Sequence, residues 1–148
     1  MRGDLTNWRQ YNIGRLLNQA VHRFESRILV LLEEQGFTGV RLAHINVTRN
    51  LDVEGTRATE LASRASMTKQ AMGELIEQCV GLGLVRREPD PADGRAKIIR
   101  FTASGLHFLD QFRLALLTAK EEMDESLGPE RVQVLLDVLW DYCHPEAP

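Results

Sequence analysis

The sequence predicts one mainly α-helical domain that carries a single small β-hairpin. Apolar residues recur at spacings of three and four over most of the 148 residues, as they do on amphipathic helices. Two short β-prone runs, 84–88 and 96–101, flank a segment that contains Pro89, Pro91 and Gly94. The length suits one domain, 1–148, that can bury a core without metal ions or disulfide bonds.

Each element has its own local signal. Helices are expected at about 7–35, 41–50, 59–65, 68–82, 102–127 and from 129 onward. Thr68 and Thr102 are good N-cap residues, and Pro129 suits the first turn of the last helix. Ser66 and Met67 form a tight connection before the fourth helix. In the second strand, Ile99 and Phe101 share one face, which we expect to be buried.

The order of helix, short helix, tight turn, helix and hairpin is that of a winged helix-turn-helix. In this arrangement the helix after the turn enters the major groove of DNA, which is wide enough to admit a helix. The helix from Thr68 takes that position, and its exposed first turns offer Thr68, Lys69, Gln70 and Gly73 to DNA. The hairpin would then reach the adjacent minor groove, where negative potential favours an inserted arginine. Arg95 suits that role, with Lys97 on a phosphate.

The run TELASRASMTKQAMGELIEQCVGLGLVRREPDPADGRAKIIRFTASG resembles the DNA-binding core of the MarR family of bacterial transcription regulators. Its most specific parts are Asp93-Gly94-Arg95-Ala96 and Thr102-Ala103-Ser104-Gly105, which are similar to that family's wing signature. The resemblance implies that Arg95 enters the minor groove and that Asp93 holds it or a neighbouring arginine by a charge-assisted hydrogen bond. It also implies a DNA-binding lobe at about 38–105 and a homodimer joined by the flanking segments, about 5–36 and 103–144.

Two residues of the recognition helix depart from the basic or hydroxyl side chains that many family members have there. Glu74 either accepts a hydrogen bond from a cytosine amino group or pairs with a cation such as Arg64, and the pairing is favoured. Gly73 either permits a close backbone approach to DNA or is a tolerated glycine near a helix start. On the first strand, Arg86 and Arg87 point to opposite faces, so at most one contacts DNA.

The charge is unevenly distributed along the chain. Residues 106–148 contain three Lys and Arg but nine Asp and Glu, whereas residues 57–105 contain eight and six. A small basic patch on an acidic body is compatible with DNA binding. The expected function is therefore a homodimeric, sequence-specific transcription regulator, most simply a repressor, on a pseudo-palindromic operator. The alternative is a winged-helix module that binds proteins instead of DNA.

Other functions have weaker support. No nucleophile, base and orienting group have a recognisable spacing, so no enzyme is expected. The histidines and cysteines lack metal-ligand spacing, so neither a metal nor another cofactor is expected, and Cys79 is expected to be an inert core residue. Without a signal peptide or a membrane span, the expected location is the cytoplasm. The resemblance further implies a small aromatic or anionic effector, for which Arg15, His22, Arg41 and His44 are candidate ligands.

Overall fold

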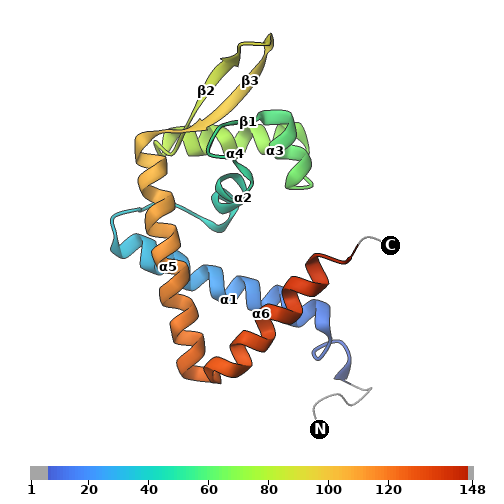
Figure 1. The fold of residues 1–148 in the computed structure, drawn as a ribbon. Coiled ribbons are helices and arrows are strands. Elements are labelled where there is room, and N and C mark those ends of the chain that lie inside the picture. Colours follow the sequence, from blue (N-terminus) through green and yellow to red (C-terminus); the bar gives the residue numbers. More distant parts are fainter. Residues whose placement is uncertain (1–6, 147–148) are drawn as a thin grey trace.

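The computed structural model describes residues 7–146 (Figure 1). Six helices and three strands follow one another as α1 Ile13–Glu34, α2 Leu42–Asn50, β1 Thr56–Arg57, α3 Ala58–Arg64, α4 Lys69–Gly81, β2 Val85–Asp90, β3 Asp93–Phe101, α5 Ala103–Leu127 and α6 Pro129–Cys143. This confirms the predicted mainly α fold with a small hairpin. Positions 5 and 6 of the expected dimerisation segment lie outside the described residues.

The predicted threonine caps account for where α4 and α5 begin. The Thr68 hydroxyl accepts a hydrogen bond from Ala71 N at 3.1 Å, and the Thr102 hydroxyl accepts one from Gly105 N at 3.0 Å. Pro129 stands in the first turn of α6, as expected. The prediction that α1 begins near residue 7 was wrong, because extended Asn12 caps the helix by accepting from Arg15 N at 2.9 Å.

The hairpin belongs to a three-stranded antiparallel sheet of order β1-β3-β2. The first strand, β1, was not predicted, since two residues are too few to show an alternating pattern. Strand β2 also continues further than expected, through Pro89. An edge strand tolerates this proline because the missing N–H would face away from the neighbouring strand. Ile99 and Phe101 are both buried on one face of β3, as predicted.

One hydrophobic core packs α4 against α1 and α5. It contains Met72, Ile76 and Cys79 of α4, Ile28 of α1 and Phe108 of α5, none of which is exposed to solvent. Burial raises the pKa of the Cys79 thiol to about 11, so the thiolate that oxidation requires is scarce near neutral pH. Cys79 is therefore a core residue, as expected.

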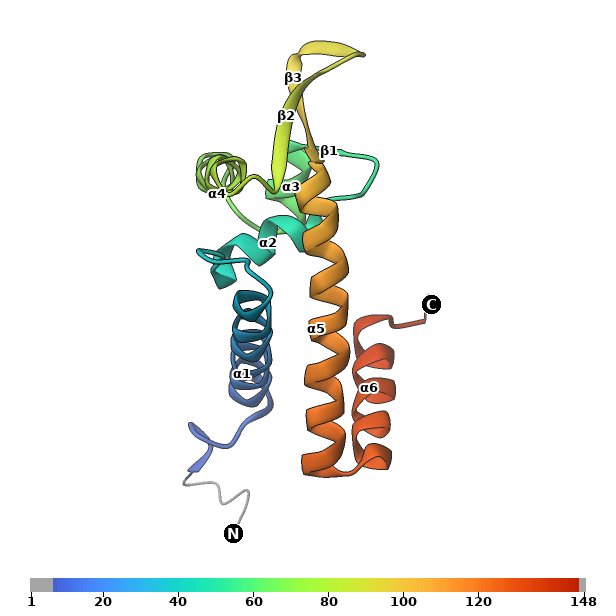
Figure 2. The same cartoon turned by 90° about the vertical axis from the view of Figure 1, so that its left-hand side faces the viewer.

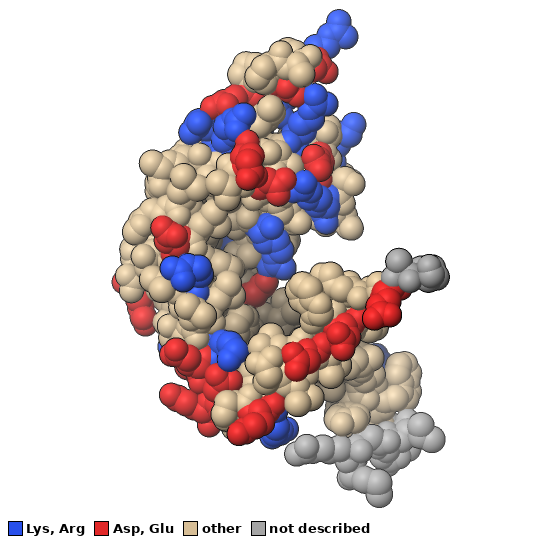
Figure 3. Space-filling view, viewed as in Figure 1, with Lys and Arg blue, Asp and Glu red and all other residues tan. Residues whose placement is uncertain are grey.

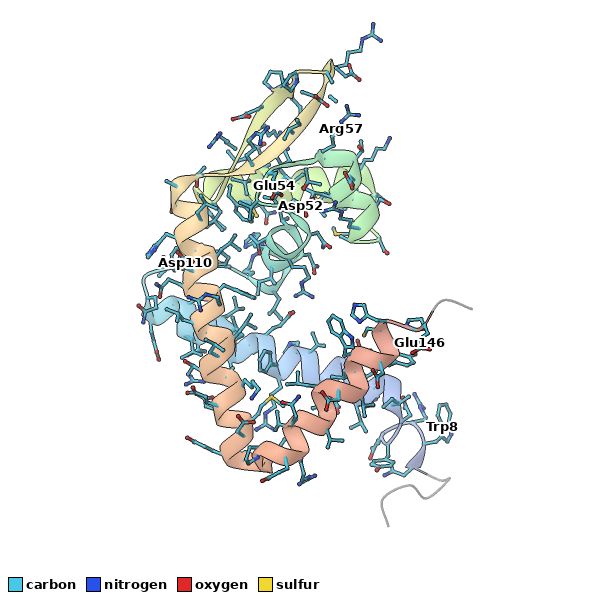
Figure 4. The ribbon with its side chains drawn as sticks, viewed as in Figure 1. Trp8, Asp52, Glu54, Arg57, Asp110 and Glu146 are labelled. Atoms are coloured by element: carbon cyan, nitrogen blue, oxygen red, sulfur yellow. The ribbon has the colours of Figure 1, made fainter. Side chains whose placement is uncertain are left out.

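The molecule has two distinct ends. Helices α2, α3 and α4, hereafter the helical lobe, form one end together with the sheet, and α5 runs from there to the opposite end, where α6 folds back beside it (Figures 1 and 2). Trp8 and Glu146, close to the two ends of the described chain, both lie on the side of the molecule formed by α1 and α6 (Figure 4). Within residues 7–146, no helix has the length and apolar character needed to span a membrane. The β2–β3 hairpin, hereafter the wing, projects furthest at the other end.

Candidate nucleic-acid interface

The start of α4 presents unobstructed backbone and side-chain groups. Ser66, with a φ of 53°, makes the tight turn after α3, and Met67 N donates a hydrogen bond to Ala62 O at 2.9 Å. This turn aims the N-terminal end of α4 away from the core, and Thr68, Lys69 and Gln70 are all exposed there. The first N–H groups of a helix carry partial positive charge and suit a phosphate.

The tip of the wing contains a bulge that carries Arg95. Pro89 pairs with Lys97 and Asp90 pairs with Asp93, so one step along β2 corresponds to four steps along β3. The three extra residues, 94–96, bulge from the ladder, and the Arg95 side chain is exposed. Asp93 Oδ1 accepts a hydrogen bond from Arg95 N at 3.1 Å. Asp93 was expected to hold an arginine side chain, but it orders the backbone of the bulge instead, because its short side chain closes a local turn.

The carboxylate that does hold an arginine at the wing is Asp90. Arg57 Nη2 lies 2.5 Å from Asp90 Oδ2, and Asp90 is only 6% exposed. The Ala92 N–H, 2.9 Å from Asp90 Oδ1, and the Arg57 guanidinium together lower the pKa of this carboxyl group. Figure 4 shows Arg57 between the wing and α3. This ion pair anchors the wing to the helical lobe, and the sequence did not reveal it because Arg57 belongs to the unpredicted strand β1.

A second contact fixes the wing against α4. Arg87 of β2 donates to Gly73 O at 3.1 Å and pairs with Glu77 Oε2 at 3.0 Å. Arg86, on the other face of the strand, pairs with Glu88 at 2.7 Å. The side chains of the two arginines therefore point to opposite faces of β2, as expected. Arg87 couples the position of the wing to the middle of α4.

The expected pair between Glu74 and Arg64 is absent, so this interpretation was wrong. Arg64 instead donates to Asn50 O at 2.7 Å, to Asp52 at 3.1 Å and to Glu60 at 2.8 Å. These partners come from the end of α2, from the following loop and from the preceding turn of α3. They hold the guanidinium away from α4, and they raise its pKa further, chiefly through the hydrogen bond to Asp52.

Gly73 has open space on its side-chain face. A Cβ atom added there would meet nothing within 4 Å. The glycine is therefore not required by packing within residues 7–146, which leaves both interpretations of it in place. Lys97 is also exposed, on β3 just below the bulge.

The acidic side chains are unevenly distributed over the molecule. On the wing and the helical lobe Lys and Arg are interspersed with Asp and Glu, whereas Asp and Glu dominate α6 and the lower part of α5 (Figure 3). The uneven charge along the sequence thus becomes an uneven charge in space. Residues 57–105 have a small net positive charge and residues 106–148 a larger net negative one, so a polyanion would be repelled less at the end that carries α4 and the wing.

The four candidate effector ligands do not form one site. Arg41 Nη2 and His44 Nε2 both lie 2.8 Å from Gln78 Oε1, and His44 Nδ1 accepts from Arg41 N at 3.0 Å. Arg15 contacts Arg9 O near the start of α1, and within residues 7–146 no hydrogen bond joins Arg15 or His22 to the Gln78 cluster. A hollow of about 220 Å³ between α1 and α5 is lined by other residues: Leu31, Gln35, Gln111, Leu114, Ala115 and Thr118. No group of three metal-ligating side chains occurs in the described part of the chain.

The helix pair α3–α4, its turn and the adjoining wing define a winged helix-turn-helix protein. Residues 38–96 match the model of the MarR family. The transcriptional regulator HosA of Escherichia coli O111:H- is 39% identical over 75 residues, which cover 51% of this chain and 53% of HosA.

Solved structures share the whole architecture. Wild-type MarR from E. coli in its apo form has a TM-score of 0.72 at 19% identity, covering 88% of this chain and 96% of MarR. The transcriptional repressor CouR bound to a 23-mer DNA duplex has a TM-score of 0.70 at 20% identity, covering 95% and 99%. CouR from Rhodococcus jostii RHA1 bound to p-coumaroyl-CoA has a TM-score of 0.68 at 23% identity, covering 93% and 95%. At these identities the likeness shows a common fold.

Proposed function

We propose that this protein is a homodimeric transcriptional repressor that inserts α4 into the major groove of an operator and Arg95 into the adjacent minor groove. The observation that carries the proposal is the joint exposure of the Thr68-capped end of α4 and the Arg95 bulge on one lobe. Arg87 and the Arg57–Asp90 pair hold these two features in a set relation. A rigid pair of contacts of this kind suits two neighbouring grooves of one duplex.

Each exposed group has a distinct role in this proposal. The Thr68 hydroxyl, the first N–H groups of α4 and the Lys69 and Lys97 ammonium groups contact phosphates and set the register. The Gln70 side chain contacts a base edge, as an amide can with adenine. Asp93 keeps the bulge ordered so that the Arg95 side chain projects from it. The duplex in the CouR complex supports DNA as the partner.

The homodimer is proposed from the surface of α6. Only Val132 of this 15-residue helix is buried, whereas Trp140 and Tyr142 are 65% and 78% exposed. Val134 and Val138 are also largely exposed, at 60% and 58%. So much apolar surface on one helix is typical of an interface. A two-fold dimer would bind a pseudo-palindromic operator with half-sites about 10 base pairs apart, centre to centre.

A small effector that releases the DNA is a further part of the proposal. It is supported by the hollow between α1 and α5 and by the CouR complex with p-coumaroyl-CoA. The hollow is lined only by α1, its C-cap and α5, and the buried residues of these two helices share one core with α4, so an occupant would shift α4 through them. Arg41 and His44 at the start of α2 both hydrogen-bond to Gln78 of α4. A movement of α2 would therefore be transmitted to the recognition helix.

The test is selection of bound fragments from random duplex DNA, followed by affinity measurement at several salt concentrations. We expect a symmetric consensus and an affinity that falls steeply with salt. Arg95→Ala should cost about 1–3 kcal/mol of affinity, whereas Arg113→Ala, an exposed arginine on α5, should leave it unchanged. If the protein enriches no duplex and instead retains a protein partner, it is an interaction module.

A further inference from the structure

One face of α4 points away from the core along its whole length. Met72, Ile76 and Cys79 are buried and mark the inner face. At about 100° per residue, the opposite face carries Gln70, Glu74 and Glu77, and all three are exposed. This outward face is the one that a helix lying in the major groove presents to the bases.

The three side chains of the outward face differ in charge and in the ion pairs that they form. Glu77 pairs with Arg87 at 3.0 Å, so its charge is matched within the protein. Gln70 is neutral. Glu74 has neither a hydrogen bond nor an ion pair with any of the residues that the structure describes, because Arg64 is committed to Asp52, Glu60 and Asn50. A free carboxylate therefore occupies the centre of the outward face.

An unpaired carboxylate in the major groove of DNA interacts favourably with few of the groups there. It is repelled by phosphates and by the acceptor atoms of guanine and thymine, and adenine places N7 beside its amino group. Cytosine presents an N4 amino donor, which is the partner that Glu and Asp use in the major groove. Gly73 adds no side chain that would keep the backbone beside Glu74 away from the bases.

We propose that Glu74 determines operator specificity by accepting a hydrogen bond from the N4 amino group of one cytosine in each half-site. The inference rests on the proposed function, since it assigns a base to a helix already placed in the groove. The side chain contributes discrimination more than affinity. Bases without the amino donor leave the carboxylate repelled and unpaired, which penalises the wrong sequence.

The experiment compares operator selections by the wild-type protein, Glu74→Ala and Glu74→Gln, with Glu125→Ala as a control at an exposed carboxylate of α5. The wild type should require cytosine at one position of each half-site, and replacing that C·G pair by T·A should weaken binding about 5- to 150-fold. Glu74→Ala should reduce this discrimination to less than about 3-fold at that position alone while retaining the rest of the consensus. Glu74→Gln should shift the preference toward adenine.

The contrary result is equally distinct. If Glu74→Ala and the wild type select the same consensus, and the variant binds every duplex more tightly by one common factor, Glu74 is only a repulsive charge and the inference is wrong while the proposed function stands. If the wild type selects no duplex, both the inference about Glu74 and the proposed function are wrong. Thermal unfolding of each variant at matched concentration verifies that the fold is retained.

Discussion

Gly105 provides a sharp test of how the wing joins α5. A Cβ atom at this position would lie 1.9 Å from the Leu84 carbonyl oxygen and 3.1 Å from Cδ1 of Phe101. The Leu84 carbonyl cannot move away freely, because it accepts a hydrogen bond from Thr102 N at 3.1 Å. The glycine is therefore required by the close approach of two backbone segments.

The size of the effect follows from this geometry. Gly105→Ala requires the backbone to shift at the junction between β2, β3 and α5, because Cβ contacts under 3.0 Å essentially never occur. Overpacking of a well-ordered core costs about 1–3 kcal/mol, and a clash with a held backbone carbonyl belongs at the upper end. At 2–4 °C per kcal/mol for a chain of this size, we expect Tm to fall by roughly 6–12 °C.

Circular dichroism during heating, at one protein concentration, measures this change. Gly73→Ala is the matched control, because its Cβ would meet nothing and alanine favours the helix by about 0.5–1 kcal/mol. The control should leave Tm unchanged or raise it slightly. A Gly105→Ala protein as stable as the wild type would show that the junction between β2 and α5 accommodates a methyl group without cost.

Three further outcomes are expected. Thr68→Ala should lower stability by about 1 kcal/mol in urea unfolding through loss of the N-cap, and Thr68→Ser should restore it. The hydrogen bonds from Arg27 lower the pKa of Glu122 in the folded state, so their stabilisation is present above pH ~4.3 and is lost as pH falls through the lowered value. Arg27→Gln should therefore make Tm less sensitive to pH on the acid side, and an unchanged acid profile would contradict this. Trp140→Glu should shift the protein from dimer to monomer in sedimentation, whereas an unchanged dimer would place the interface elsewhere.

The helices and their caps were predictable because the signals are local. Thr68 and Thr102 act within one turn of their own positions, and the stripe of Met72, Ile76 and Cys79 needs only the helical period. The wing was predictable for the same reason, since Ile99 and Phe101 alternate with exposed or half-buried residues. The bulge at 94–96 was not predictable, because it depends on the register between β2 and β3.

Partners of charged groups were the weakest part of the prediction. Arg64 was expected to meet Glu74 on the neighbouring helix, but the fold brings it to the end of α2 and the following loop. Asp93 was expected to hold an arginine, and the nearby Asp90 does so because β1 places Arg57 against it. Each choice depends on which carboxylate comes within about 4 Å, and sequence spacing does not determine that distance between separate elements.

The sequence by itself determined the winged helix-turn-helix order, the capped start of α4 and the presence of Arg95 near the tip of the hairpin. These depend on side chains acting on their own backbone within a few residues. Only the tertiary structure decided that Arg87 ties the wing to α4, that α6 is left with its apolar surface uncovered and that Glu74 is unpaired among the described residues. Such properties arise from the packing of distant segments, in which each charged or apolar group meets whatever the fold brings beside it.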